Sequence, residues 1–217
     1  MQEFIQVTGM VIKAVPVFET DKRIVILTKE RGAVTVFARG AKKPNNRFLA
    51  TTDVFCYGTF KLVEGKSAYT LTDAHIENYF QDIRNDFEGA MYGMYFADVA
   101  DYYCRENNDE KEMLKLLYAS LLALLKDSIS NDLVKCIYEM KALTINGEFT
   151  GVIEGHALED TTKYTIEFVR NTPVEKLYSF TVSEKVLGEL IRECEYYRKK
   201  YIGHSFKSLS ILESCKL

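Results

Sequence analysis

Several features that are typical of enzymes are missing from this 217-residue chain. It has only three histidines, which are scattered, and no Cys–His or Ser–His pair stands in a recognisable local context. Neither of the two glycine-rich patterns that cradle phosphates, GxxxxGK[ST] and GxGxxG, occurs. We therefore expect a protein without catalytic activity.

Cysteines are few, and long apolar runs are absent. The five cysteines are an odd number with wide, irregular spacing, which fits neither a disulfide framework nor a zinc cluster: Cys56, Cys104, Cys136, Cys194 and Cys215. The N-terminus lacks a basic region followed by an apolar stretch, and no run approaches the roughly 18 apolar residues of a membrane span. These absences predict reduced thiols, no membrane association and a cytoplasmic location.

Charge is distributed unevenly along the chain, although the net charge is only −3. Residues 1–66 hold 11 Lys and Arg against 6 Asp and Glu, a net charge of +5. Residues 81–160 hold 7 against 16, a net charge of −9. Phosphate binding depends on the local density of cations, so a basic face on an acidic protein can bind nucleic acid. The acidic middle segment would repel DNA, and we expect it to pack internally or to contact a protein.

The first third of the chain has the alternating pattern of short strands, bounded by glycine or charged turn residues. About five such runs precede the first helical pattern, at residues 11–17, 24–27, 34–37, 54–63 and 68–76. Five short strands are the strand number of an OB-fold barrel, a fold that commonly binds single-stranded nucleic acid.

Basic side chains follow the third of these runs. Arg39, Lys42, Lys43 and Arg47 lie within nine residues, and Gly40 and Pro44 favour an open loop in which the backbone can approach a ligand closely. Lys22 and Arg23 lie in the turn between the first two runs, which is a rim position in an OB-fold. We predict that these six side chains contact DNA. The competing interpretation is a set of solvated turns that keep the protein soluble.

Aromatic residues of the same region could stack on bases. Because an aromatic residue in a strand more often belongs to the core, we expect Phe18, Phe37, Phe55 and Phe60 to be buried. For Phe48 and Tyr57 both interpretations stay open.

From Phe80 onward the apolar period changes from two to about 3.6. The pattern predicts helices from residue 80 to 102, from Asp109 to Lys126, and from Asn131 to Leu143, joined into a bundle. Ser183 is the expected N-cap of a later helix, and residues 205–212 form a short closing helix with Leu209 and Leu212 inside. Between these helices, Tyr164–Val169 and Leu177–Val182 alternate around Asn171-Thr172-Pro173, which predicts a β-hairpin.

A second basic group ends the helix that follows Ser183. It could contact DNA or the acidic tail of a protein, or it could compensate the helix dipole, and its members are Arg198, Lys199, Lys200 and Lys207.

Three motifs stand in a characteristic order: Thr8-Gly9, then Ala38-Arg39-Gly40 with Lys42 and Lys43, then Lys207-Ser208-Leu209 ahead of Leu212-Glu213. In this order, nearly from end to end, the chain resembles the RecO family of bacterial recombination mediators. The resemblance implies a protein that binds single- and double-stranded DNA and anneals complementary strands coated with single-stranded-DNA-binding protein. It also implies that the protein works with RecR to load RecA.

The chain departs from this family between residues 144 and 182, where many members carry four cysteines that bind a structural zinc ion. No cysteine lies between Cys136 and Cys194, and a lone His156 cannot complete a tetrahedral site. We therefore expect no zinc. The expected fold class is α+β: an OB-fold domain over residues 1–79, then a helical domain over 80–217 in which the hairpin replaces the zinc-bearing module.

Two other functions stay open. In the first, the barrel has lost DNA binding and the protein is an adaptor for other proteins, in keeping with its acidic middle segment. In the second, the OB-fold binds RNA, because recognition of the sugar needs contacts to the 2′-hydroxyl that one sequence does not reveal.

Overall fold

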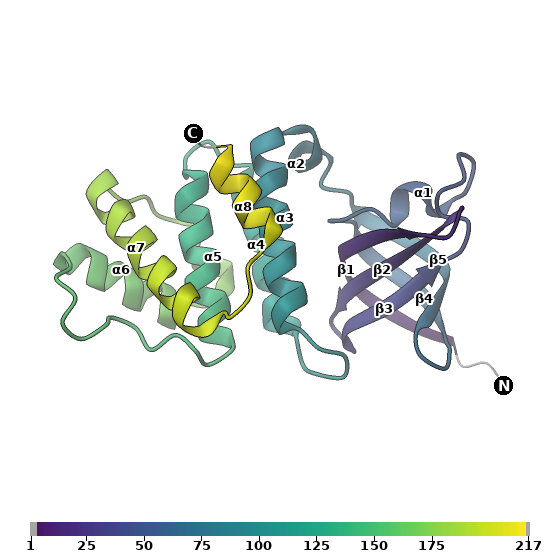
Figure 1. Ribbon diagram of the computed structural model, residues 1–217, viewed down its shortest axis with the longest axis horizontal. Helices are drawn as coiled ribbons and strands as arrows, with labels where there is room; N and C mark the ends of the chain where they lie inside the picture. The colour runs from purple at the N-terminus through teal and green to yellow at the C-terminus, as the bar shows by residue number, and fades with distance from the viewer. Residues whose placement is uncertain (1–3, 216–217) are drawn as a thin grey trace. The chain divides into compact units, whose positions relative to one another are not determined.

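A computed structural model describes residues 4–215 of the chain (Figure 1). Two compact units are formed, each from two segments of the sequence. Of the described residues, the first contains 4–81 and 97–114, and the second contains 82–96 and 115–215. Residues 97–114 belong to the helical domain in the sequence-based division, yet they group with the barrel.

The first unit contains a closed five-stranded barrel, and the predicted OB-fold is confirmed (Figure 1). The strands follow one another around the barrel in the order β1-β2-β3-β5-β4. All neighbouring pairs are antiparallel except β3 and β5, which are parallel. A short helix connects β3 to β4. The elements are β1 Phe4–Val17, β2 Asp21–Thr28, β3 Gly32–Ala38, α1 Phe48–Thr51, β4 Tyr57–Glu64 and β5 Tyr69–Asn78.

Alternating burial explains why these residues close into a barrel. Along β3 every second residue is buried, so Val34, Val36 and Ala38 face the interior. Ile24 and Ile26 of β2 do the same. Each fully buried aliphatic side chain contributes about 1.5–3 kcal/mol to the stability of the fold. Because side chains alternate along a strand, a shift of one residue in register would expose the whole apolar set and lose this contribution.

Gly9 and Gly58 face each other where β1 pairs with β4, and both are required by close approach of neighbouring backbone. A Cβ atom on Gly9 would lie 2.2 Å from the carbonyl oxygen of Leu27, and one on Gly58 would lie 2.2 Å from that of His75. No side chain can be accommodated at such distances. The Thr8-Gly9 motif therefore reflects tight strand packing in the barrel.

The remaining elements of the described chain are helices: α2 Gln81–Asn85, α3 Phe87–Tyr103, α4 Lys111–Leu124, α5 Asn131–Ile145, α6 Asp160–Asn171, the 3₁₀ helix Val174–Lys176, α7 Glu184–Tyr201 and α8 Lys207–Ser214. The helix expected from residue 80 to 102 is divided in two, because the Asp86 carboxylate accepts a hydrogen bond from the Gly89 N–H (2.8 Å) and starts α3 as a new helix. The expected cap of α7 is confirmed, since the Ser183 hydroxyl accepts from the Val186 N–H.

The predicted β-hairpin is wrong. Tyr164–Val169 lies within α6, and residues 177–182 follow the 3₁₀ helix without pairing as a strand. The buried residues of α6 recur at helical spacing: Thr162, Thr165, Ile166 and Val169. The alternation of Tyr164, Ile166 and Phe168 concealed this period, and the helix buries its apolar side against α5 and α7.

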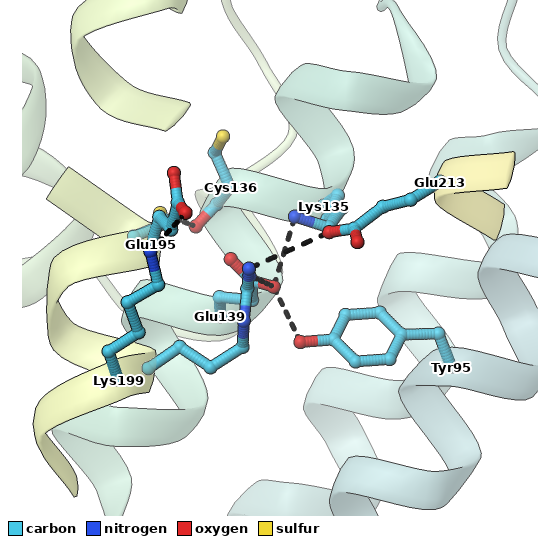
Figure 2. Close-up of polar contacts among 9 residues, drawn as sticks. Tyr95, Lys135, Cys136, Glu139, Glu195, Lys199 and Glu213 are labelled. Carbon is cyan, nitrogen blue, oxygen red and sulfur yellow. Dashed lines mark hydrogen bonds and ion pairs between the residues drawn. The ribbon is translucent and has the colours of Figure 1, made fainter. Parts of the chain in front are cut away.

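A charged network joins four helices inside the second unit (Figure 2). The Glu139 side chain of α5 is only 4% exposed, and its Oε1 atom accepts from the Tyr95 hydroxyl of α3 (2.5 Å). The same oxygen lies 3.1 Å from Lys135 Nζ of α5 and 3.0 Å from Arg198 Nη1 of α7. Arg198 also reaches Glu213 of α8 at 3.7 Å. Every residue of α5 from Leu133 to Leu143 is buried, so this network lies in the centre of its unit.

Electrostatics keeps the Glu139 carboxyl ionised at this buried position. Burial alone would raise its pKa, but the charges of Lys135 and Arg198 and the hydrogen bond from Tyr95 outweigh burial and leave the pKa below its ordinary value. Burial, together with the adjacent Glu139 carboxylate, holds the pKa of Tyr95 well above its usual range, so its hydroxyl remains a donor.

Candidate nucleic-acid interface

Residues 39–47, between β3 and α1, form a loop at one end of the barrel, which we call the basic loop. Its backbone is hydrogen-bonded to the turn between β1 and β2: the Lys42 N–H donates to the Thr20 carbonyl (2.8 Å), and the Gly40 N–H donates to Asp21 Oδ1 (2.8 Å). Within the loop, the Lys43 N–H donates to the Gly40 carbonyl (2.9 Å). Gly40 has a φ of +67°, a conformation that favours glycine. The loop is therefore held in one conformation before any ligand binds.

Asp21 is the side chain that anchors the loop, and sequence reasoning did not identify it. The hydrogen bond from the Gly40 N–H and a second one from the Thr20 hydroxyl lower the pKa of its carboxyl, with smaller contributions from the charges of Arg39 and Lys43. The carboxylate is therefore ionised at neutral pH and partly offsets the positive charge of the loop.

Three cations of the basic loop face solvent. Arg39, Lys42 and Lys43 are exposed, and within the described residues none of them has a carboxylate within 4 Å. Arg23 is also exposed. It and Lys22 lie within β2 instead of the turn predicted for them, because the strand begins at Asp21. The backbone of Arg23 pairs with that of Phe37, near the end of β3 where the loop begins. The structure thus brings these four predicted residues to the same end of the barrel.

Two other predicted DNA contacts, Lys22 and Arg47, are already paired with carboxylates of the first unit. The Lys22 side chain is only 13% exposed, and its Nζ atom lies 2.7 Å from Asp53 Oδ1 and 3.1 Å from the Leu49 carbonyl oxygen. Arg47 is exposed, but its guanidinium reaches Asp73 Oδ1 (3.3 Å) and the Thr72 carbonyl. Either side chain would have to leave these partners to bind a phosphate.

The aromatic residues divide differently from the expectation. Phe55 and Phe60 are buried as expected, Phe48 is also buried, and Phe37 is half-buried. Tyr57 is half-buried, with Lys29 Nζ 5.7 Å from the centre of its ring.

Phe18 was expected in the core, and this is wrong, since 85% of the residue is exposed. The polar run Glu19-Thr20-Asp21 that follows it marks Phe18 as a turn residue, and this signal could have found it.

The members of the second basic group differ in their exposure and in their partners. The Arg198 side chain is only 16% exposed, and it is paired with Glu139 at 3.0 Å and with Glu213 at 3.7 Å. Lys199 is exposed, and its Nζ lies 2.6 Å from Glu195 Oε1. Lys200 lies over the ring of Tyr201, with its Nζ 5.1 Å from the ring centre, and Lys207 is exposed in the first turn of α8.

The family's structural zinc does not fit the residues of this chain. Among residues 4–215, no three His, Cys, Asp or Glu side chains are placed to hold a metal ion together. His156, the lone candidate between residues 144 and 182, is hydrogen-bonded to Glu193 (2.6 Å). The absence of zinc stays a prediction.

Among the described helices, none is both long and apolar enough to cross a lipid bilayer.

Two family models match this chain. The model described as "Recombination protein O N terminal" matches residues 1–80, and the one described as "Recombination protein O C terminal" matches residues 84–149. Both matches end before α6, α7 and α8.

Curated relatives extend over nearly the whole sequence. "DNA repair protein RecO" of Acetivibrio thermocellus is 26% identical and is aligned over 97% of this chain and 97% of its own length. The protein of the same name from Clostridium perfringens strain 13 is also 26% identical, over 96% of this chain and 97% of its own. That of Halalkalibacterium halodurans is 30% identical over 144 residues, which are 66% of this chain and 56% of the relative.

Proposed function

Because the chain belongs to the RecO family, we propose that it is a DNA repair and recombination mediator that binds DNA through the basic end of its barrel. One observation carries the proposal: Arg39, Lys42 and Lys43 face solvent on a loop that Thr20 and Asp21 hold in place. Cations in fixed positions bind phosphates without the entropic cost of ordering a flexible loop.

The same chemistry supports strand annealing. Two DNA strands repel each other through their phosphates, and a protein that neutralises both backbones lowers this repulsion. Contacts to phosphates carry no sequence information, which suits a protein that must act on any pair of complementary strands. In this proposal the protein binds single- and double-stranded DNA and acts on strands coated with single-stranded-DNA-binding protein. It also assists RecR in loading RecA, without hydrolysing a nucleotide, in the cytoplasm.

DNA binding is tested by charge reversal. Changing Arg39, Lys42 and Lys43 together to Glu should abolish binding of a fluorescent oligothymidylate measured by anisotropy, while the circular dichroism spectrum and melting temperature stay unchanged because the side chains are exposed. The milder triple change to Ala should reduce the slope of log K against log salt by about 2, since each phosphate contact to a single strand contributes about 0.7.

A matched control separates this site from general electrostatics. Lys66, in the turn between β4 and β5, is exposed like Lys42. Lys66→Glu should weaken binding much less than Lys42→Glu. Equal effects of the two changes, or unchanged binding by the triple Glu variant, would favour the adaptor function and make the basic loop a solubility feature. An RNA oligomer in the same titration tests the RNA alternative.

Annealing is tested with complementary strands coated with the cognate single-stranded-DNA-binding protein, at low and moderate salt and with chelator throughout. We expect annealing that survives the chelator and weakens with salt. A folded protein that anneals nothing, even with RecR supplied, would contradict the proposal.

A further inference from the structure

Phe18 is exposed to an extent that is unusual for a phenylalanine. It follows β1 directly and is 85% exposed, more than any other large hydrophobic residue in the described part of the chain. Its φ of +52° lies in the left-handed region, which an aromatic residue rarely adopts. An exposed apolar ring on a strained backbone does not stabilise the fold, and such outliers occur preferentially where a ligand is bound.

The turn that carries Phe18 is the one that anchors the basic loop. Thr20, two residues further along, accepts the hydrogen bond from Lys42, and Asp21 accepts the one from Gly40. The aromatic ring and the exposed cations are therefore carried by two hydrogen-bonded backbone segments. Nucleic-acid sites that bind single strands combine these same two components, since cations hold the phosphates and an aromatic ring stacks on a base.

We propose that Phe18 is a stacking platform for an unpaired base of single-stranded DNA, while Arg39, Lys42 and Lys43 hold the neighbouring phosphates. This inference rests on the proposed function and makes it more specific. Within a duplex both faces of each base are covered by neighbouring bases, so only an unpaired base offers a face to the ring. Phe18 should therefore distinguish single-stranded from double-stranded DNA, whereas the basic loop should bind both.

The neighbours of Phe18 favour a base over an apolar protein surface. Glu19, Thr20 and Asp21 make the remainder of the turn polar. Protein-binding sites with an apolar centre need a contiguous patch of such side chains. A single ring close to cations fits a nucleotide, because an unpaired base offers an apolar face to the ring and the backbone carries negative charge.

The sequence has no tryptophan, so Phe18→Trp places a single fluorescent reporter at the proposed platform. We expect saturable quenching of this tryptophan by a thymidine oligomer, and little quenching by a duplex of the same length. Phe4→Trp is the matched control, because Phe4 is 70% exposed at the opposite end of β1. Its fluorescence should not respond to either form of DNA.

Affinity is the second readout. Stacking on one base corresponds to roughly 5- to 150-fold in affinity, so Phe18→Ala should weaken binding of single-stranded DNA by a factor in this range. Phe18→Tyr should bind single-stranded DNA about as tightly as wild type, because a tyrosine ring can also stack on a base. Binding of duplex DNA should change less than about two-fold, and the melting temperature should not fall, because the ring is exposed.

Each outcome separates this inference from the proposed function. If the wild-type protein binds DNA but Phe18→Ala binds both forms as well as wild type, stacking is refuted and DNA binding stands. If Phe18→Ala weakens single-stranded and duplex binding equally, Phe18 acts through the loop conformation and not by stacking. If it weakens only binding to the single-stranded-DNA-binding protein, Phe18 is a protein contact. A wild-type protein that binds no DNA contradicts both proposals.

Discussion

Replacing Glu139 by Gln should destabilise the helical unit strongly. The change keeps the shape of the side chain but removes the negative charge that the Lys135 and Arg198 cations share at 3.1 and 3.0 Å. These two side chains are only 11% and 16% exposed, so water cannot replace the lost partner. Breaking a buried ion pair from one side typically costs about 3–5 kcal/mol. For a protein of this size the cost corresponds to a fall of roughly 6–20 °C in melting temperature.

The measurement is thermal and urea unfolding followed by circular dichroism at 222 nm, which reports mainly on the helices. Glu195→Gln is the matched control, because Glu195 pairs with Lys199 at 2.6 Å on the surface of α7, where both side chains are about half exposed or more. Exposed pairs contribute about 0–1 kcal/mol, so this control should melt close to wild type.

A further variant tests the reason for the loss. Replacing Lys135, Glu139 and Arg198 together by apolar residues of similar volume should cost much less than Glu139→Gln alone, because no buried charge is left without a partner. The surface control should lose less than about 1 kcal/mol of unfolding free energy. If Glu139→Gln loses as little, the buried ion pairs do not stabilise the helical unit.

The difference in the free energy of unfolding between wild type and Glu139→Gln should also depend on pH. The pKa of Glu139 lies below its ordinary value of 4.5 in the folded protein, so the unfolded chain takes up a proton more readily than the folded one. This contribution to stability is therefore complete above about pH 5 and is lost as the pH falls through the folded-state pKa. The two unfolding curves should converge in acid, and a difference that grows below pH 4.5 would contradict the assignment.

Three further predictions follow from the barrel and from the missing zinc ligands. Gly9→Ala should lower the free energy of unfolding in urea by about 3 kcal/mol or more, because the new Cβ would lie 2.2 Å from a backbone carbonyl oxygen. Gly188→Ala in α7 is the control: no atom lies within 4 Å of its Cβ position, so this change should raise the free energy of unfolding by up to about 1 kcal/mol. Arg47→Ala should lower stability slightly and leave the salt dependence of DNA binding nearly unchanged, whereas Lys42→Ala should lower the slope by about 0.7, as measured by anisotropy. Dialysis against a strong chelator should leave the melting temperature unchanged, and a fall on metal removal would show that the chain binds a structural metal after all.

Local patterns were enough to predict a large part of this fold. The strand runs, the barrel and the cap at Ser183 depend on consecutive residues, whose periodicity and hydrogen-bonding groups are visible in the sequence. The resemblance to the RecO family rested on short motifs of the same kind. Periodicity gave a wrong prediction in α6, because the apolar residues of this short segment fit both the alternation of a strand and the spacing of a helix. Burial against α5 and α7 favours the helix.

By itself the sequence determined the barrel, the helical region after it and the position of the basic loop. Only the tertiary structure decided which cations are held in ion pairs, because their partners lie far away in the chain: Asp53 for Lys22, Asp73 for Arg47 and Glu139 for Arg198. It also decided that the turn after Phe18 holds the basic loop, since Thr20 and Asp21 accept hydrogen bonds from Lys42 and Gly40, about twenty residues away in the chain. Strand formation depends on neighbouring residues, whereas ion pairing and exposure depend on contacts between residues that only folding brings together.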